Sequence, residues 1–161
     1  MDPVAYFEMN FKPNVALVSV VRRFVTQFYA RFLSDPDGTS RVALATHELL
    51  ENAVKYSKDG ETTIRIEVDQ SQSPKQVRIT LRNRANEVDI ARIRELLEGV
   101  QSAQNVTNFY QELIASKVKL REGSGLGLAR ICAEGEMQLK YSVVDGDVAV
   151  IEAVATVGDS P

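Results

Sequence analysis

Two stretches of alternating apolar and polar residues, each turning back on itself, restrict this chain more than any other feature of its sequence. The run TTIRIEVD is joined to QVRITLRN by the polar segment QSQSPK, and the final run MQLKYSVVDGDVAVIEAVAT turns at DGD. Alternation places apolar side chains on one face of a strand, and Asp-Gly is a strong hairpin signal. We therefore predict two β-hairpins, whose common apolar face a second layer must cover.

The second layer is predicted to be helical. Apolar residues recur three and four apart in VALVSVVRRFVTQF, which is typical of an amphipathic helix, and Asn14 precedes them as a candidate N-cap. After a predicted loop, SDPDGTS, a second helix is expected over residues 41–57. EVDIARIRELL and FYQELIASKVKL are also predicted to be helical, whereas GVQSAQNVTN between them is predicted to be a mobile loop.

A first strand in AYFEMNF and a helix after the segment REGSGLGLAR complete the pattern. Strands with helices gathered on one face indicate an α+β fold, here a two-layer α/β sandwich. The chain has 161 residues, which is enough for one domain with a sizeable core, and we expect a single domain over residues 1–161.

Composition excludes several classes of function. A net charge of -3 gives no basic footprint, so nucleic acid is not an expected partner. The longest apolar run, VALVSVV, is far shorter than the ~20 residues of a membrane span, and Asp2 and Glu8 do not suit a secretion signal. The single cysteine, Cys132, excludes an internal disulfide. We expect a cytoplasmic protein.

The segment THELLENAVKYS carries a polar stripe along a predicted helix. Glu48, Asn52 and Lys55 share one face, beside an apolar stripe. A carboxylate and an amide one turn apart can hold Mg²⁺, which takes only one or two protein oxygens when phosphates supply others. Glu48 could orient or deprotonate a hydroxyl, and Lys55 could neutralise phosphate. The alternative is a solvated polar face.

The segment EGSGLGLAR places Gly123, Gly125 and Gly127 just before a predicted helix. Glycines let backbone N–H groups approach an anion, and a helix N-terminus adds its positive dipole end, so such a loop can cradle phosphates. A flexible hinge is the alternative. The triplet does not follow a strand, and no GKS or GKT is present, which disfavours both the dinucleotide fold and the P-loop.

Together, ELLENAVKYS and GSGLGLAR resemble the N box and G2 box of the GHKL (histidine-kinase-like) ATPases. FEMNFKPNVALVSVVRRFVTQF followed by RVALATHELLENAV is similar to the stand-alone serine/threonine kinases that act as anti-sigma factors in bacteria. The resemblance extends over nearly the whole chain. It implies the histidine-kinase-like (Bergerat) two-layer sandwich, with a mixed sheet and helices on one face.

The resemblance also implies roles for individual residues. Asn52 would be the Mg²⁺ ligand, Glu48 the catalytic carboxylate, and Lys55 a neighbour of the phosphates of ATP. The phosphate loop would comprise Gly123, Gly125, Leu126 and Gly127. The segment from residue 86 to 122 would be the ATP lid, whose end carries Lys117, Lys119 and Arg121.

The chain departs from this family where a G1 box, Asp-x-Gly-x-Gly, is expected. The segment NRANE stands there, so Asn83 replaces the aspartate that accepts from the adenine amino group, and Ala85 and Glu87 replace the glycines. Asn83 can still accept through its amide oxygen, without the charge. This change is expected to weaken adenine binding and leaves the metal and phosphate ends of the site untouched.

The resemblance implies an ATP- and Mg²⁺-binding regulatory protein that phosphorylates a serine or threonine of a partner. The partner would be a small antagonist protein, a sigma factor or another regulator, and a homodimer is also implied. Two alternatives stay open: a non-catalytic binding module, and a catalytic domain acting on a histidine of another chain. His47, the one histidine, lies inside the N-box helix and is expected to be structural.

Overall fold

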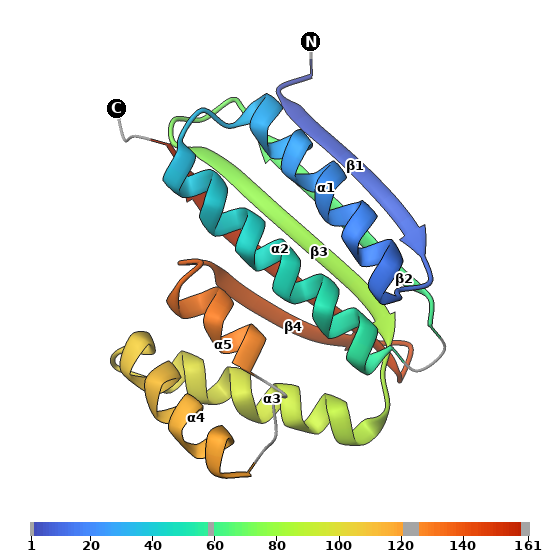
Figure 1. Cartoon of the computed structure of the whole chain (residues 1–161), viewed down its shortest axis with the longest axis vertical. Coiled ribbons are helices and arrows are strands. Elements are labelled where there is room, and N and C mark those ends of the chain that lie inside the picture. Colours follow the sequence, from blue (N-terminus) through green and yellow to red (C-terminus); the bar gives the residue numbers. More distant parts are fainter. Residues whose placement is uncertain (1, 58–59, 121–125, 159–161) are drawn as a thin grey trace.

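The computed structural model of the chain is a five-stranded sheet with helices packed against it (Figure 1). It describes residues 2–57, 60–120 and 126–158, with the backbone alone at 117–120. The strands are β1 Val4–Phe11, β2 Thr62–Asp69, β3 Lys75–Arg84, β4 Gln138–Val144 and β5 Val148–Val157. The helices are α1 Val15–Phe32, α2 Pro36–Tyr56, α3 Glu87–Ser102, α4 Val106–Leu120 and α5 Leu126–Ala133. The first strand and both predicted hairpins are confirmed.

Neighbouring strands are antiparallel throughout the described sheet, in the order β1-β2-β3-β5-β4. The mixed sheet implied by the resemblance is therefore wrong for these strands. The connections explain the result, because α1 and α2 run in opposite directions and deliver the chain into β2 antiparallel to β1 (Figure 1). The last hairpin then inserts β5 beside β3, which leaves β4 at the edge.

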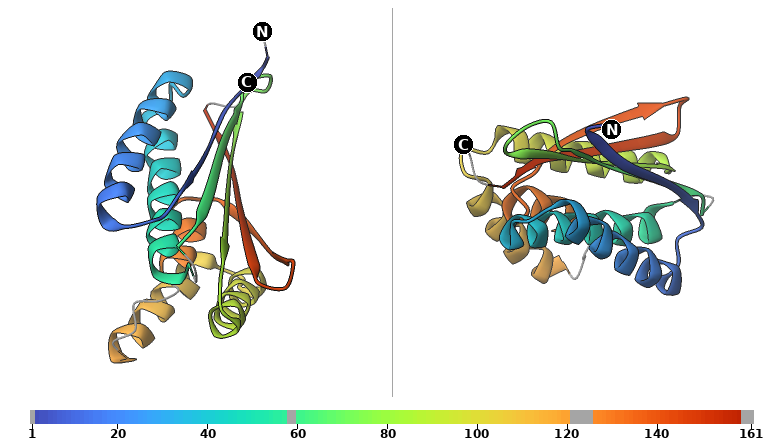
Figure 2. Two further views of the ribbon diagram at one scale, coloured as in Figure 1. Left: turned by 90° about the vertical axis from the view of Figure 1, so that its right-hand side faces the viewer. Right: turned by 90° about the horizontal axis from the view of Figure 1, so that it is seen from above.

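Helices α1 and α2 lie side by side on one face of the sheet, and α5 continues this layer beside α2 (Figures 1 and 2). The core fills the space between the two layers, as the alternating strands and the amphipathic helices predict. Its largest fully buried side chains include Tyr29, Leu49, Leu50, Ile64, Ile66, Ile79, Leu81, Leu128 and Ile131. Packing on three sides fixes α2, because it contacts α1, the sheet and α5.

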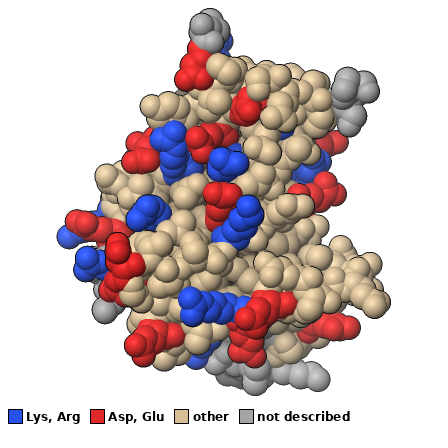
Figure 3. All heavy atoms as spheres, turned by 180° about the vertical axis from the view of Figure 1, so that it is seen from behind, with Lys and Arg blue, Asp and Glu red and all other residues tan. Residues whose placement is uncertain are grey.

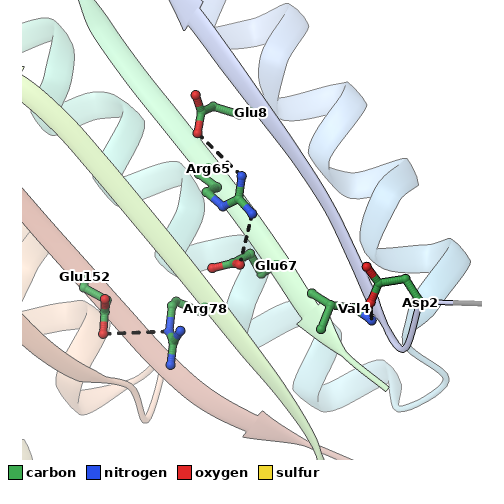
Figure 4. Close-up of polar contacts among 7 residues, drawn as sticks. All are labelled: Asp2, Val4, Glu8, Arg65, Glu67, Arg78 and Glu152. Carbon is green, nitrogen blue, oxygen red and sulfur yellow. Dashed lines mark hydrogen bonds and ion pairs between the residues drawn. The ribbon is translucent and has the colours of Figure 1, made fainter. Parts of the chain in front are cut away.

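The opposite face of the sheet carries basic and acidic side chains intermixed (Figure 3). Arg65 lies between Glu8 and Glu67, at 3.6 and 3.3 Å, and Arg78 lies 3.8 Å from Glu152 on a neighbouring strand (Figure 4). Exposed ion pairs contribute only on the order of 0–1 kcal/mol each. This face is therefore a solvated surface. Among the described helices, none has both the length and the apolarity to cross a membrane.

The predicted loop SDPDGTS is instead the beginning of α2, which starts at Pro36 rather than at Arg41. The side chain of Asp35 accepts a hydrogen bond from the N–H of Asp37 at 3.1 Å, and proline fits the first turn because its missing N–H is not needed there. Gly38 lies against β5, since a Cβ at this position would come within 2.5 Å of Val157 Cγ1. The residues that indicated a turn are the cap and first turn of a helix.

The predicted mobile loop GVQSAQNVTN is also wrong, because only residues 103–105 connect α3 to α4. The side chain of Asn105 accepts from the N–H of Asn108 at 3.0 Å at the start of α4. Val100 and Tyr110 are buried in one cluster, so the two helices pack on each other. Exposed polar side chains on both helices concealed this pattern. In its described part, the segment assigned to the ATP lid is thus mainly a pair of helices.

Candidate functional site

The predicted polar stripe of α2 lies on the side of the helix that faces α5. Leu49 and Ala53 anchor the helix, because both are fully buried in the core. Beside them, the Glu48 side chain is only 15% exposed and Asn52 only 9% exposed, whereas Lys55 is exposed. A shielded carboxylate and amide require polar partners. The stripe is therefore more than a solvated helix surface.

A cavity of about 320 Å³ lies between α2, α4 and α5. Its lining comprises Glu48, Glu51, Asn52, Lys55, Tyr110, Ile114, Leu126, Gly127 and Arg130. The fold therefore brings together five residues that the sequence selects: Glu48, Asn52, Lys55, Leu126 and Gly127. Other predicted residues lie outside the described ones, namely Gly123, Gly125 and Arg121, together with the side chains of Lys117 and Lys119.

Gly127 permits the close approach of α5 to Glu48. A Cβ built at this glycine would come within 2.6 Å of Glu48 Oε2, which is closer than non-bonded atoms tolerate. Gly127 is the second residue of α5, so it belongs to the helix as well as to the predicted phosphate loop. Its lack of a side chain thus makes room for a carboxylate at the edge of the cavity.

Arg130 is a site residue that the sequence analysis missed. Its Nη1 donates a hydrogen bond to Glu48 Oε1 at 3.0 Å, and its Nε lies 3.1 Å from Glu134 Oε2. The hydrogen bond to Glu48 raises the pKa of Arg130, against the opposing effect of burial. The signal was present, because Arg130 follows Gly127 by three residues and so lies on the same face of a helix. It places a guanidinium group, paired with two carboxylates, at the wall of the cavity.

A second cavity, of about 530 Å³, adjoins the first and shares Asn52 with it. The two cavities have no other lining residue in common. Five of its eleven lining residues have wholly apolar side chains, which come from α3, α4 and α5: Ile93, Leu96, Phe109, Leu113 and Leu128. Asn52 therefore stands at the junction of a polar compartment and an apolar compartment.

Asn83, the predicted adenine partner, lies elsewhere. It is 8% exposed and faces Thr62 across the β2–β3 ladder, and its Nδ2 donates to the carbonyl of Arg84 at 3.1 Å. It lines a separate cavity of about 760 Å³ at the ends of these strands, together with Lys12, Glu61 and Arg82 among others. That cavity shares no lining residue with the two cavities beside Asn52.

The donors around Asn52 fit a weakly ligated oxygen-binding cation. Within the described residues, no group of three or more His, Cys, Asp or Glu side chains could hold a metal by protein ligands alone. Mg²⁺ does not require such a group when phosphates and waters complete its shell. Asn52 supplies an amide oxygen to the polar cavity, and Glu48 and Glu51 supply carboxylates nearby. His47 is directed elsewhere, because it lines a different cavity against α1.

Comparison with known proteins gives the family of this chain and a solved structure of similar fold. The profile of the histidine kinase-like ATPase domain matches residues 11–133, which include α2 and the glycine segment. In the crystal structure of the SiaB–SiaC complex from Pseudomonas aeruginosa, one chain has a similar fold, with a TM-score of 0.67 and 16% identity over 96% of this chain and 90% of that chain. No curated protein matches the chain. The resemblance to the GHKL ATPases is thus confirmed, and this chain belongs to the histidine kinase-like ATPase domain family.

Proposed function

We propose that the chain binds ATP with Mg²⁺ in the two cavities that meet at Asn52, and that it transfers a phosphoryl group to a hydroxyl of a regulatory partner protein. One observation carries the proposal: the Glu48–Asn52–Lys55 stripe faces the N-terminus of α5 across a polar cavity, and an apolar cavity adjoins it. A nucleotide requires this combination, because its phosphates and its base need opposite surroundings.

The phosphate end is assigned to the polar cavity of about 320 Å³. Leu126 and Gly127 begin α5 there, so backbone N–H groups without a partner inside the helix and the positive end of the helix dipole face the cavity. Lys55 and Arg130 add two cationic side chains to the lining. These groups suit the triphosphate of ATP, whose charge they would neutralise.

Asn52 is the proposed protein ligand for Mg²⁺. An amide oxygen binds the ion without adding charge, and the remaining positions suit phosphate oxygens and waters. The ion, when bound, neutralises charge on the transferring phosphoryl group. Because Asn52 is largely buried at the junction of the cavities, it can fix where the phosphates lie relative to the base.

Glu48 is the proposed catalytic carboxylate. Its carboxylate is held from two sides, by the hydrogen bond from Arg130 and by the close approach of Gly127. A fixed carboxylate can accept a hydrogen bond from the hydroxyl of a serine or threonine and orient it toward the phosphoryl group. Phosphoryl transfer depends mainly on such positioning and on charge neutralisation.

The proposed partner is a protein of a bacterial regulatory switch: a small antagonist, a sigma factor or another regulator. The resemblance to the anti-sigma kinases supports this class, and the structurally similar chain comes from a complex between two proteins, SiaB and SiaC. The proposed location is the cytoplasm, where ATP and such partners occur together.

Transfer of radiolabel from γ-labelled ATP to co-encoded regulatory proteins tests the proposal directly. We expect a labelled serine or threonine with the wild type and Mg²⁺. Glu48→Gln should lower transfer at least about a hundredfold, as expected when a catalytic group is lost, while ATP binding changes little. Glu8→Gln, on the outer face of the sheet, is the matched control. An equal loss of binding and transfer in Glu48→Gln would assign Glu48 to binding instead of catalysis.

A non-catalytic binding module is the second candidate, and the segment NRANE favours it. Ala85 is buried and its N–H donates to the carbonyl of Asp147 at 2.9 Å, so this segment continues the sheet where the family has a glycine turn. A protein that binds nucleotide and partner without any transfer would establish this candidate. A protein with neither nucleotide binding nor transfer would contradict the kinase proposal and leave a module that binds only its partner.

A further inference from the structure

The cavity of about 530 Å³ beside Asn52 has the size and lining of a site for a flat aromatic ring. Ligand sites are typically apolar, with a few polar groups that fix the orientation of the ligand. Five of its eleven lining residues have wholly aliphatic or aromatic side chains, and its polar members are Asn52, Tyr56, Asp89, Arg92 and Glu95. Recognition of one base over another must therefore come from this short list.

Asp89 is the best-placed acceptor among these polar residues. A purine amino group is a hydrogen-bond donor and needs an acceptor, and a carboxylate offers acceptors alone. The described lining contains two carboxylates, Asp89 and Glu95. Glu95 is exposed to solvent, whereas Asp89 is partly buried, so a hydrogen bond to Asp89 is better shielded from water.

Local structure holds Asp89 in position. It lies in the first turn of α3, where a negative charge is favourable, and its N–H donates to Asn86 Oδ1 at 2.9 Å. The next residue, Ile90, is buried in one cluster with Ala85 and Ala149, so this turn packs against the end of the sheet. A carboxylate on a capped helix is held more rigidly than one on a loop.

Asn83, by contrast, lines the separate cavity, which shares no lining residue with this one. We propose that Asp89 accepts the hydrogen bond from the 6-amino group of the nucleotide base, so that a carboxylate from α3 replaces the missing aspartate of the G1 segment. This inference rests on the proposed function, and it defines the ligand as a 6-aminopurine nucleotide.

Calorimetric titration with two ligands tests the assignment. ATP carries the 6-amino group and purine riboside triphosphate lacks it, and both are used with Mg²⁺. The wild type should prefer ATP by at least about tenfold, the effect of one hydrogen bond to a charged group. Asp89→Ala should bind both ligands with equal affinity, and Asp89→Asn should show an intermediate preference. Circular dichroism of each variant verifies that α3 is intact.

Two further variants sharpen the result. Glu98→Gln makes the same change of charge at an exposed position of α3 outside the cavity, and it should keep the wild-type preference. If Asp89→Ala keeps the preference, or if Glu95→Ala abolishes it, the assignment to Asp89 is overturned. If the wild type binds both ligands with equal affinity, the cavity makes no hydrogen bond to the 6-amino group, and the proposal is overturned. If the wild type binds neither ligand, the proposed function itself fails.

Discussion

At the scale of single residues, the contact between Gly127 of α5 and Glu48 of α2 determines how closely the two helices approach at the site. The sequence predicted that α2 would present Glu48, Asn52 and Lys55 together, because helical spacing alone determines which residues share a face. The spacing of Arg130 from Gly127 was also visible, but its contact with Glu48 depends on the packing of α5 against α2, and the place of Asp89 in the second cavity depends on the packing of α3 against α4 and α5. A pattern within one element is thus easier to predict than a contact between elements.

Gly127→Ala should impair phosphoryl transfer with little loss of stability. The added methyl group would lie 2.6 Å from Glu48 Oε2 and displace the carboxylate from Arg130. Alanine is also the better helix former by about 1 kcal/mol, which offsets the crowding. We expect transfer to fall at least about tenfold, because small misplacements of catalytic groups are costly. Thermal unfolding and labelled transfer measure the two effects, and an unchanged rate would contradict the role of this contact.

Cys132 should be poorly reactive in the folded protein. Burial raises the pKa of its thiol from 9.0 to about 11, and the thiolate is the nucleophile. The thiolate therefore becomes abundant only as the pH approaches 11. At pH 8, alkylation by iodoacetamide should be slower by on the order of a hundredfold than in the urea-unfolded chain. Mass spectrometry gives both rates, and equal rates at pH 8 would show that the thiol is accessible in the fold.

At the scale of elements, one buried hydrogen bond joins α1 to α2. Tyr29, which is fully buried, lies 2.8 Å from Thr46 Oγ1, and Thr46 in turn donates to the carbonyl of Val42 at 2.7 Å. Because Thr46 gives its one hydroxyl proton to Val42, the Tyr29 hydroxyl is the donor to Thr46, and burial keeps it protonated by raising the pKa of Tyr29. Thr46 thus keeps a hydrogen-bond partner when the Tyr29 hydroxyl is removed, whereas the Tyr29 hydroxyl loses its acceptor when Thr46 is replaced.

Removing either partner of this bond should destabilise the protein by different amounts. Tyr29→Phe leaves Thr46 with its carbonyl partner and should cost about 1 kcal/mol. Thr46→Val leaves the Tyr29 hydroxyl buried without an acceptor and should cost more, about 2–3 kcal/mol. Urea unfolding gives both free energies. If Tyr29→Phe proved the more damaging change, the direction assigned to this hydrogen bond would be wrong.

The limits of the elements were predicted less well than their types. Asp35 and Pro36 are turn formers in isolation, yet here they cap and begin α2 because the following turn packs against β5 through Gly38. Polar residues around position 103 likewise suggested a long loop, although buried Val100 and Tyr110 extend α3 and α4 toward each other. Tertiary packing decided both cases.

For the whole molecule, nucleotide binding should be coupled to folding. A ligand that binds only the folded state stabilises it, by about 2.7 kcal/mol at a hundredfold excess over Kd. ATP with Mg²⁺ should therefore raise the melting temperature, and EDTA should remove most of this effect. Asn52→Ala should lose the part that depends on Mg²⁺ and keep its fold, since Asn52 lies at a cavity wall rather than in the apolar core. Full Mg²⁺ dependence in this variant would remove Asn52 from the metal site.

The fold class followed from alternation and helical periodicity, but the directions of the strands did not. The alternation within a strand shows which of its faces is buried, but it does not show which strand lies beside it. The antiparallel placement of β5 next to β3 could therefore be found only from the structure. The departure at NRANE was visible in the sequence. That Asn83 and Asn52 line different cavities could be found only from the structure, because it depends on where the strand ends meet the helices.

The contact between Gly127 and Glu48 also constrains how this chain can diverge. Because a Cβ at position 127 would displace a glutamate carboxylate at position 48, we expect selection for function to couple the two positions. Relatives that keep glutamate on α2 should keep glycine on α5, and an alanine on α5 should occur with a shorter side chain, such as aspartate, on α2. A substitution at one of these positions should therefore be accompanied by a substitution at the other, although the two lie 79 residues apart in the chain (127 less 48).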